Sequence, residues 1–194
     1  MRFPGQEAKG PISATVIVDG RHLSDVIKLL SGHVDALSAG SASAVFVLRN
    51  PLEGSEEISP LDSGEFIPGA SIEIALGYSA RDIRVFQGKI VAQRLTYDSD
   101  CFGRLHVICE GALNGQDGGL KLTLADDLLT LDARRLAEGG SGRLRSVGVA
   151  EGLGSRLELD GIGERFRGPY RITGVRHEFR SGVWETDLTF ELLY

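Results

Sequence analysis

Three stretches of the sequence hold residues that could carry out acid-base chemistry. Arg176, His177 and Glu178 follow one another, and a histidine between two charged residues could transfer protons. Nothing nearby completes a catalytic triad, so His177 is predicted to be a partly buried, hydrogen-bonded strand residue. The adjacent carboxylates Glu56-Glu57 and Asp126-Asp127 are predicted to lie in an exposed loop and a turn. Neighbours on an extended chain point in opposite directions, and Asp is favoured in turns.

The signatures of metal proteins and of common enzyme classes are absent from the sequence. Its two cysteines and four scattered histidines lack metal-site spacing, and it has no nucleophile elbow, phosphate loop or dinucleotide fingerprint. Gly161-Ile162-Gly163 is predicted to be a turn rather than a phosphate cradle. Cys101 and Cys109 would lie about 27 Å apart on one strand, which predicts free thiols in a reducing compartment. The sequence therefore predicts no catalytic residue, no metal and no cofactor.

Composition restricts the classes of partner. The chain has 194 residues, enough for one large β-domain or two small ones, and 42% of them are hydrophobic. With 27 acidic against 21 basic residues, its net charge of −6 predicts protein partners rather than nucleic acid. No run approaches the roughly 20 apolar residues of a membrane span, and the first residues lack the apolar core of a signal peptide. We expect synthesis in the cytoplasm.

A strand pattern around His177 is repeated earlier in the chain. The repeated positions are Phe86, Gly88 and Ile90 in the first stretch and Phe166, Gly168, Tyr170, Ile172 and His177 in the second. The two stretches lie 80 residues apart, and Tyr97 stands in the place of His177. A second similarity links residues 68–74 to residues 153–159, 85 residues later. Self-similarity of this kind predicts two related β-units in tandem, with chance recurrence of Gly, Phe and aliphatic residues as the alternative.

Alternating apolar and polar residues locate the predicted strands. They cover residues 14–18, 44–49, 71–77, 83–97, 104–110 and 184–192. The last is the clearest, because Trp184, Leu188 and Phe190 share one face while Glu185 and Asp187 share the other. Residues 24–30 fit either a short helix or a strand.

Glycine, proline and charged residues mark the predicted connections. Residues 1–13 are predicted to be an irregular arm, and residues 53–65 an exposed acidic loop. Residues 120–124 and 129–133 alternate on either side of a turn, which predicts a β-hairpin. Residues 136–148 are predicted to be a loose connector. A basic cluster nearby could face an acidic partner or simply solvent, and consists of Arg134, Arg135, Arg143 and Arg145.

Several short motifs resemble the hub module of contractile tails. They are Val16-Ile17-Val18-Asp19-Gly20, residues 43–51, Phe66-Ile67-Pro68-Gly69 with residues 72–78, and Val85-Phe86-Gln87-Gly88. The family includes phage late control D proteins, the VgrG spikes of type VI secretion and the baseplate hubs of myoviruses. Residues 161–178, with the core Phe-x-Gly-x-Tyr-x-Ile-x-x-Val-x-His, resemble the second barrel of these hubs.

The resemblance implies a mainly β fold of two tandem small antiparallel β-barrels with few or no helices. The expected parts are an N-terminal arm (1–13), a first hub barrel (14–111), a reduced connector with a β-hairpin (112–150) and the remainder of the second barrel (151–194). The implied role is structural and non-enzymatic: a homotrimeric ring joins a sixfold tail tube to a threefold spike. Partners would be the tube protein, a separate spike protein and other baseplate subunits, assembled into a phage tail or an extracellular contractile particle.

Two other functions fit the same sequence. A hydrolase of peptidoglycan or another glycan would use paired carboxylates from the acidic loops. A free-standing β-barrel adaptor or carbohydrate-binding module would need exposed aromatic residues, and aromatics make up only 7% of the chain.

Overall fold

The computed structural model describes residues 11–23, 27, 29–38, 41–51, 59–79, 81–97, 103–114, 119–136 and 139–193. These residues form thirteen strands and one single-turn 3-10 helix, η1 (Glu164–Phe166). The strands are β1 (Ile12–Val18), β2 (Arg21–His22), β3 (Leu29–Ser38), β4 (Ser41–Asn50), β5 (Ser71–Tyr78), β6 (Arg81–Tyr97), β7 (Gly103–Leu113), β8 (Leu120–Thr123), β9 (Leu128–Leu136), β10 (Gly139–Val147), β11 (Arg156–Asp160), β12 (Tyr170–Arg180) and β13 (Val183–Leu192). The predicted mainly β fold is confirmed.

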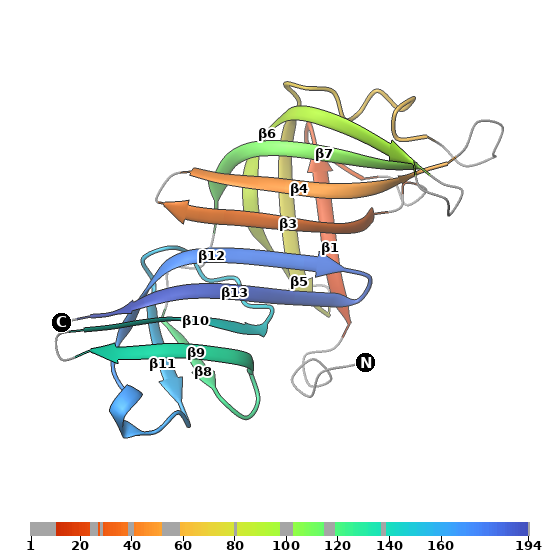
Figure 1. The fold of residues 1–194 in the computed structure, drawn as a ribbon. Helices are drawn as coiled ribbons and strands as arrows, with labels where there is room; N and C mark the ends of the chain where they lie inside the picture. The colour runs from red at the N-terminus through yellow and green to blue at the C-terminus, as the bar shows by residue number, and fades with distance from the viewer. Residues whose placement is uncertain are drawn as a thin grey trace.

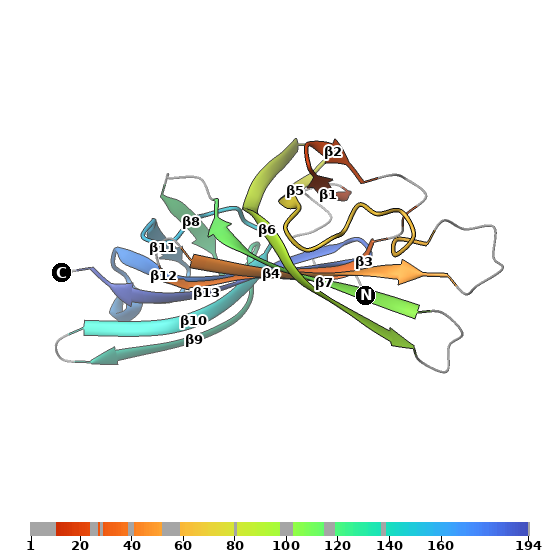
Figure 2. The same ribbon diagram turned by 90° about the horizontal axis from the view of Figure 1, so that it is seen from above.

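Most of the strands lie side by side in one broad sheet. Figure 1 shows β6, β7, β4, β3, β12, β13, β10 and β9 in this order, each hydrogen-bonded to the next. Strands β1 and β5 cross behind one half of the sheet, and β8 and β11 cross behind the other half. Seen from above, both groups lie on the same side (Figure 2). The broad sheet therefore has one covered face and one open face.

Two units of the chain repeat the same strand order. In the first unit the order is β1-β5-β6-β7-β4-β3, and in the second it is β8-β11-β12-β13-β10-β9. The units differ at one end, because β1 pairs antiparallel with β5 whereas β8 pairs parallel with β11. They join where residues 31–36 of β3 pair antiparallel with residues 175–180 of β12. We call this pairing the junction.

The turns that precede the outgoing strand of each unit are equivalent in detail. Gly69 donates its N–H to the carbonyl of Ile90 at 2.8 Å, and Gly154 donates to the carbonyl of Ile172 at 2.8 Å. In return, the amide of Ile90 donates to the carbonyl of Ala70, and the amide of Ile172 donates to the carbonyl of Ser155, both at 3.0 Å. Both glycines have positive φ, 98° and 87°, a conformation that glycine adopts without steric cost. The similarity between residues 68–74 and 153–159 is thus a shared turn and strand.

The outgoing strands also share a β-bulge, which fixes how they correspond. The pairing of β6 with β7 shifts between Ile90 and Ala92, and that of β12 with β13 shifts between Ile172 and Gly174. The hydrogen bonds therefore match Ile90 with Ile172, at a separation of 82 residues. The 80-residue match predicted from the Phe-x-Gly motif is two residues out of register, because Phe86 lies within β6 whereas Phe166 lies in η1 before its strand begins.

Side-chain alternation produces the core between the two layers. On β4, Ala42, Ala44, Phe46 and Leu48 are buried and the residues between them are more exposed. Two hydrophobic clusters form, and the one in the first unit also takes in Ala150, Phe179 and Trp184 of the second unit. In the second cluster Tyr170 packs edge-on against Phe190, with ring centroids 4.9 Å apart. Burial of such side chains contributes roughly 1.5–3 kcal/mol each, which makes the covered face the main source of stability.

The structure corrects the prediction for residues 112–150. The predicted hairpin of residues 120–124 with 129–133 is wrong, because β8 pairs in parallel with β11 while β9 pairs with β10. The segment 136–148 is largely strand β10 rather than a loose connector. Glycine and serine at positions 139–142 suggested a linker, yet Gly142 permits close packing: a Cβ there would lie 2.5 Å from the carbonyl oxygen of Asp132. Tertiary packing here outweighs local propensity.

The other predicted strands and loops are confirmed in part. The strands predicted at 44–49, 71–77, 83–97, 104–110 and 184–192 are confirmed as β4, β5, β6, β7 and β13. The first strand starts at Ile12 instead of residue 14, paired with Tyr78. Most of the helix-or-strand segment 24–30 lies outside the described residues, as do residues 53–58 of the acidic loop, Glu56-Glu57 included. The pairings run through the junction as one path, so the predicted tandem barrels stay a prediction.

Candidate assembly surface

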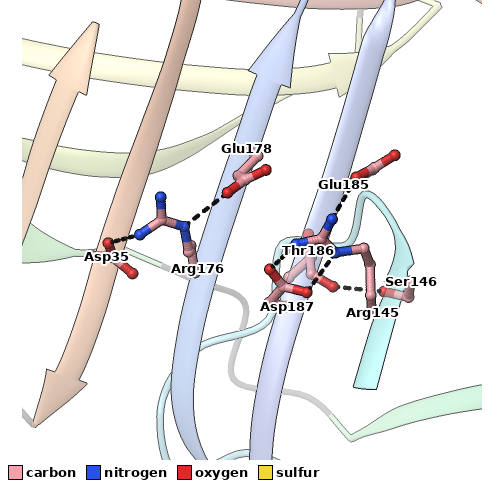
Figure 3. Close-up of polar contacts among 8 residues, drawn as sticks. All are labelled: Asp35, Arg145, Ser146, Arg176, Glu178, Glu185, Thr186 and Asp187. Atoms are coloured by element: carbon pink, nitrogen blue, oxygen red, sulfur yellow. Dashed lines mark hydrogen bonds and ion pairs between the residues drawn. The ribbon is translucent and has the colours of Figure 1, made fainter. Parts of the chain in front are cut away.

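The open face of the broad sheet carries two groups of ion pairs that join neighbouring strands. We call it the outer face. It is formed by the alternate residues of β9, β10, β13, β12, β3, β4, β7 and the end of β6 that point away from the core. Cross-strand pairing places Arg145 opposite Asp187, and Arg176 opposite both Asp187 and Asp35. Figure 3 shows these side chains in a row across four strands.

An ion-pair network crosses the junction. Arg176 on β12 donates from Nη1 to Asp35 Oδ2 on β3 and from Nε to Glu178 Oε1 at 2.9 Å (Figure 3). The arginine and the aspartate are 141 residues apart in sequence and come from different units. All three side chains are partly exposed, so the network contributes at most about 1 kcal/mol but fixes the register of β3 against β12.

A second network lies on β10 and β13. Arg145 donates to both carboxylate oxygens of Asp187, at 2.7 and 2.6 Å, and contacts Glu185 at 3.4 Å. These hydrogen bonds raise the pKa of Arg145, which stays charged. Glu185 is buried, and an unpaired carboxylate there would be costly. One member of the predicted basic cluster is thus held by acids of its own chain.

A shallow groove of about 410 Å³ lies beside the junction on the outer face. Its walls include Val45 and Val47 on β4, His33 on β3, His106 on β7 and Glu178 on β12. Burial lowers the pKa of both histidines, which favours their neutral forms at neutral pH. The described residues contain no group of three or more His, Cys, Asp or Glu side chains placed to hold a metal ion.

His177 lies on the opposite, covered face. It is fully buried, its Nδ1 lies 3.1 Å from Thr186 Oγ1, and its ring meets Trp184 edge-on with centroids 6.0 Å apart. The Thr186 hydroxyl donates to the Val149 carbonyl at 3.2 Å, so His177 donates from Nδ1 and leaves Nε2 as an acceptor without a partner in the described structure. Burial lowers the pKa of His177 to about 4, which keeps the ring neutral. The sequence predicted a partly buried, hydrogen-bonded histidine, and the structure shows His177 hydrogen-bonded but fully buried.

The other predicted repeat residues lie in the cores, within strand β6, or at and just after η1, where Phe166 and Gly168 are found. Phe86, Ile90, Tyr170 and Ile172 are buried, each in the cluster of its own unit. Gly88 faces the Glu110 carbonyl at a distance that leaves no room for a Cβ, and Gly168 lies against Leu192. These residues are not brought together in one site, so their contribution is to the shape of the two units.

Aromatic residues hold the units together behind the junction. Trp184 on β13 stacks on Tyr78 of β5, with ring centroids 5.3 Å apart and planes 26° apart. The ring of Phe179 covers Gly32, where a Cβ would lie 2.2 Å from the ring. Burial raises the pKa of Tyr78 to about 12, so its hydroxyl stays protonated. Trp184, Phe179, Tyr78 and Gly32, which sequence analysis did not single out as a set, form what we call the junction cluster.

The broad sheet, from β6 to β9, ends in two strand edges. Strand β9 pairs only with β10. Strand β6 leaves β5 after Lys89 and pairs from there only with β7, apart from the turn contacts at Ile90. We call residues 93–97 the β6 edge and residues 131–135 the β9 edge. In the part of the chain that the structure describes, neither has a strand partner on its outer side, and such edges are templates for pairing with another chain.

Comparison with known proteins assigns the family. The model of the Alg8 N-terminal domain matches residues 8–116, more than half of the chain. The chain belongs to the Alg8 N-terminal domain family. The match spans β1 to β7, so it covers the whole first unit. No curated protein matches the sequence significantly.

Solved structures of tail proteins have the same fold as this family member. A tail protein from Neisseria meningitidis superposes with a TM-score of 0.62 at 10% identity, over 94% of this chain and 96% of the other. The E. coli c3393 protein, a type VI secretion component with structural similarity to T4 tail proteins gp27 and gp5, gives 0.62 at 11% identity, over 92% and 76%. A 43 kDa tail protein of prophage MuSo2 from Shewanella oneidensis gives 0.61 at 7% identity, over 92% and 98%.

These likenesses establish the fold of this chain. They extend over both units, beyond the residues that the family model covers. The resemblance to tail hubs noted from the sequence motifs is confirmed at the level of fold. Among the described residues there is no helix with the length and apolar character required to span a bilayer.

Proposed function

We propose that this chain is a structural hub subunit of a contractile tail or injection particle, in which three copies form a ring between a tail tube and a spike. The observation that carries the proposal is the doubled unit. Each unit has the same strand order, the same glycine turn and the same bulge, within a fold shared with tail proteins.

The duplication suits a symmetry adaptor. Three copies with two similar units each present six similar surfaces, while the chain itself repeats only three times around the ring. Such a ring can contact a sixfold tube through equivalent unit surfaces and a threefold spike through features that occur once per chain. The proposed partners are therefore the tube protein, a spike protein and neighbouring baseplate subunits.

The proposed division of the chain follows the sheet. An arm precedes the first unit, which we place at residues 14–111, extended by the start of β1 at Ile12. Residues 112–150, predicted to be a connector, contribute β8, β9 and β10 to the second unit, and residues 151–194 complete it. The repeat residues, from Phe86 to His177, serve the shape of the units. Arg145 and Arg176 on the outer face are engaged with acids of the same chain, which supports a structural rather than a catalytic role for these residues.

Light scattering coupled to size-exclusion chromatography tests this function. The purified chain is expected to run as a homotrimer, to appear as rings by electron microscopy, and to bind a tail tube protein and a spike protein. A monomer at all concentrations that binds neither partner would overturn the proposal. Hydrolysis of peptidoglycan by the purified chain would favour the hydrolase instead.

A further inference from the structure

The two free edges of the sheet correspond to the two strands that meet at the junction. The shared bulge matches the β6 edge with residues 175–179 of β12. Pairing through β4 and β10 matches the β9 edge with residues 32–36 of β3. Ala44 on β4 corresponds to Gly142 on β10, because they oppose the equivalent residues Cys109 and Phe190. Counted from these positions, Gly32, which opposes Phe46, corresponds to Leu131, which opposes Leu144. Each edge thus has an internal counterpart that is already paired.

We propose that the β6 edge of one copy pairs antiparallel with the β9 edge of a second copy, so that the sheet continues across the subunit boundary. Transfer of the junction register places Gln93 opposite Arg135, Leu95 opposite Ala133 and Tyr97 opposite Leu131. The inference rests on the proposed function for the number of copies in the ring, and on the internal repeat for the strands and their register.

Strand direction supports this pairing. In Figure 1 the arrows of β6 and β12 point one way, and those of β3 and β9 point the other way. A second copy placed with its β6 beside β9 would therefore meet it antiparallel, as β12 meets β3. The two edges lie at opposite ends of the broad sheet, so one copy cannot pair its own edges without disrupting the sheet. The contact is head-to-tail, which generates a ring when the rotation closes.

Exposed apolar side chains mark the same edges. Tyr97 is 57% exposed and Leu95 is 38% exposed, whereas their junction counterparts Phe179 and His177 are 3% and 0% exposed. On β9, Leu136 is 52% exposed beside the edge. Positions that are buried inside the junction are thus occupied by large apolar residues where no partner covers them, the pattern of an interface.

Side-chain sizes are complementary at the proposed contact. At the junction, Gly32 makes room for the Phe179 ring while Trp184 fills the neighbouring position on β13. At the edges the small and large residues exchange places: Gly103 is the counterpart of Trp184, and Leu131 is the counterpart of Gly32. Tyr97 leans over Gly103, where a Cβ would lie 2.9 Å from its ring, and Leu131 of the second copy would cover it.

One pair in this register is unfavourable and supplies a test. Arg94 would oppose Arg134, whereas at the junction Arg176 opposes Asp35. Both arginines lie on the outer face, and Asp132 would lie diagonally across from Arg94, as Glu178 neighbours Arg176. Like charges directly opposite each other weaken a strand pair, so the register predicts that reversal of either charge strengthens assembly.

Disulfide trapping in a Cys101→Ser background tests the register. Residues directly opposite each other are within reach of a disulfide, whereas diagonal residues, roughly 7–8 Å apart, are not. Leu95→Cys with Ala133→Cys should form covalent dimers and trimers on oxidation, and Leu95→Cys with Arg135→Cys should not. Separately purified Leu95→Cys and Ala133→Cys chains should give covalent dimers only when mixed. Asp35→Cys with Arg176→Cys, across the junction, is the positive control for cross-linking within one chain.

Charge reversal tests the same register without a covalent bond. Arg94→Glu alone and Arg134→Glu alone should each lower the concentration for half-assembly by up to about fivefold, and the double variant should lose this gain. Equal behaviour of single and double variants would overturn the register. A trimer that binds tube and spike without the 95–133 cross-link would overturn the β6–β9 pairing but leave the hub function intact. Cross-linked rings that bind neither partner would support the pairing and overturn the hub.

Discussion

The junction and the free edges are two versions of the same strand pair, one closed within the chain and one open. At the junction, β12 and β3 bury Phe179 and His177 and join Arg176 to Asp35. At the edges, the corresponding residues are Tyr97, Leu95 and Arg94, and they remain exposed or unpaired across the strand. The same backbone frame thus serves one contact that must be permanent and one that can form only after folding.

The difference lies in polarity and size rather than in backbone geometry. The junction adds the stacked pair Trp184–Tyr78 and the ion pair Arg176–Asp35 between the units. It is therefore stable without contacts from another chain. The edges keep apolar side chains but oppose two arginines, which favours a weaker, reversible contact. Duplication of the unit, followed by divergence of the contact residues, accounts for both the stable junction and the weaker contact at the edges.

Removal of the indole of Trp184 should have the largest effect on this comparison. Trp184 is 2% exposed and connects β13 with Tyr78 of the other unit. Trp184→Ala should lower the free energy of unfolding by about 3–5 kcal/mol, measured by urea denaturation of the monomer, with Trp184→Phe intermediate. Tyr97→Ala, the control on the free edge, should change it by less than about 0.5 kcal/mol while weakening assembly. Equal losses from both variants would contradict the distinction between junction and edge.

Titration of His177 should give the next largest effect. The pKa of this histidine is about 4 in the folded chain against 6.5 ordinarily, because burial disfavours the charged ring. Below pH 6.5 the unfolded chain binds a proton that the folded chain does not, so stability should fall by roughly 1.4 kcal/mol per pH unit between pH 6.5 and 4. Below pH 4 this contribution should level off.

The repeat supplies the matched variant for that titration. His177→Leu places in the second unit the residue that the first unit has at position 95, and should flatten the dependence of unfolding free energy on pH. A smaller slope should remain, because burial also lowers the pKa of His33 and His106. Parallel curves for the two proteins would show that His177 does not titrate as its burial requires.

Gly32→Ala should have an intermediate effect at the junction. A Cβ at this position would lie 2.2 Å from Phe179 Cζ, so the buried ring must move. Overpacking of this kind should lower the free energy of unfolding by about 1–3 kcal/mol, measured by thermal or urea denaturation. Leu131→Ala, at the corresponding position of β9, truncates a side chain that is only partly buried against the second cluster, and should in addition weaken assembly. A Gly32→Ala chain as stable as wild type would refute the tight contact.

Much of the fold could be predicted from the sequence, because it depends on local patterns. Strand alternation located β4, β5, β6, β7 and β13, and the glycine turns at Gly69 and Gly154 lie within the similarity that indicated duplication. The Phe-x-Gly motif misled the alignment by two residues, since a shared bulge and not a shared side chain fixes the correspondence. Sequence similarity records residue types, whereas the repeat is conserved here in backbone hydrogen bonds.

The candidate surface was harder to predict, because its contacts join distant residues. Arg176 and Asp35 are 141 positions apart, and neither has a sequence signature for the other. The same holds for Arg145 with Asp187, although alternation had placed the acids of β13 on one face. The glycine-rich start of β10 suggested a linker, and its role became visible only beside Asp132 and Phe190. Edges are defined by the pairing of the whole sheet, which a single strand pattern does not report.

The smallest effect is expected from the ion pair that distinguishes the junction from the edges. Asp35→Asn removes the charge that Arg176 meets across the strand, but both side chains are partly exposed and Glu178 still holds the arginine. The loss in unfolding free energy should be about 1 kcal/mol or less. A double-mutant cycle with Arg176→Gln, measured by urea denaturation at low and high salt, should give a coupling energy that salt reduces. A coupling near zero at low salt would mean that apolar contacts alone fix the junction register, and the Arg94–Arg134 opposition would then matter little for assembly.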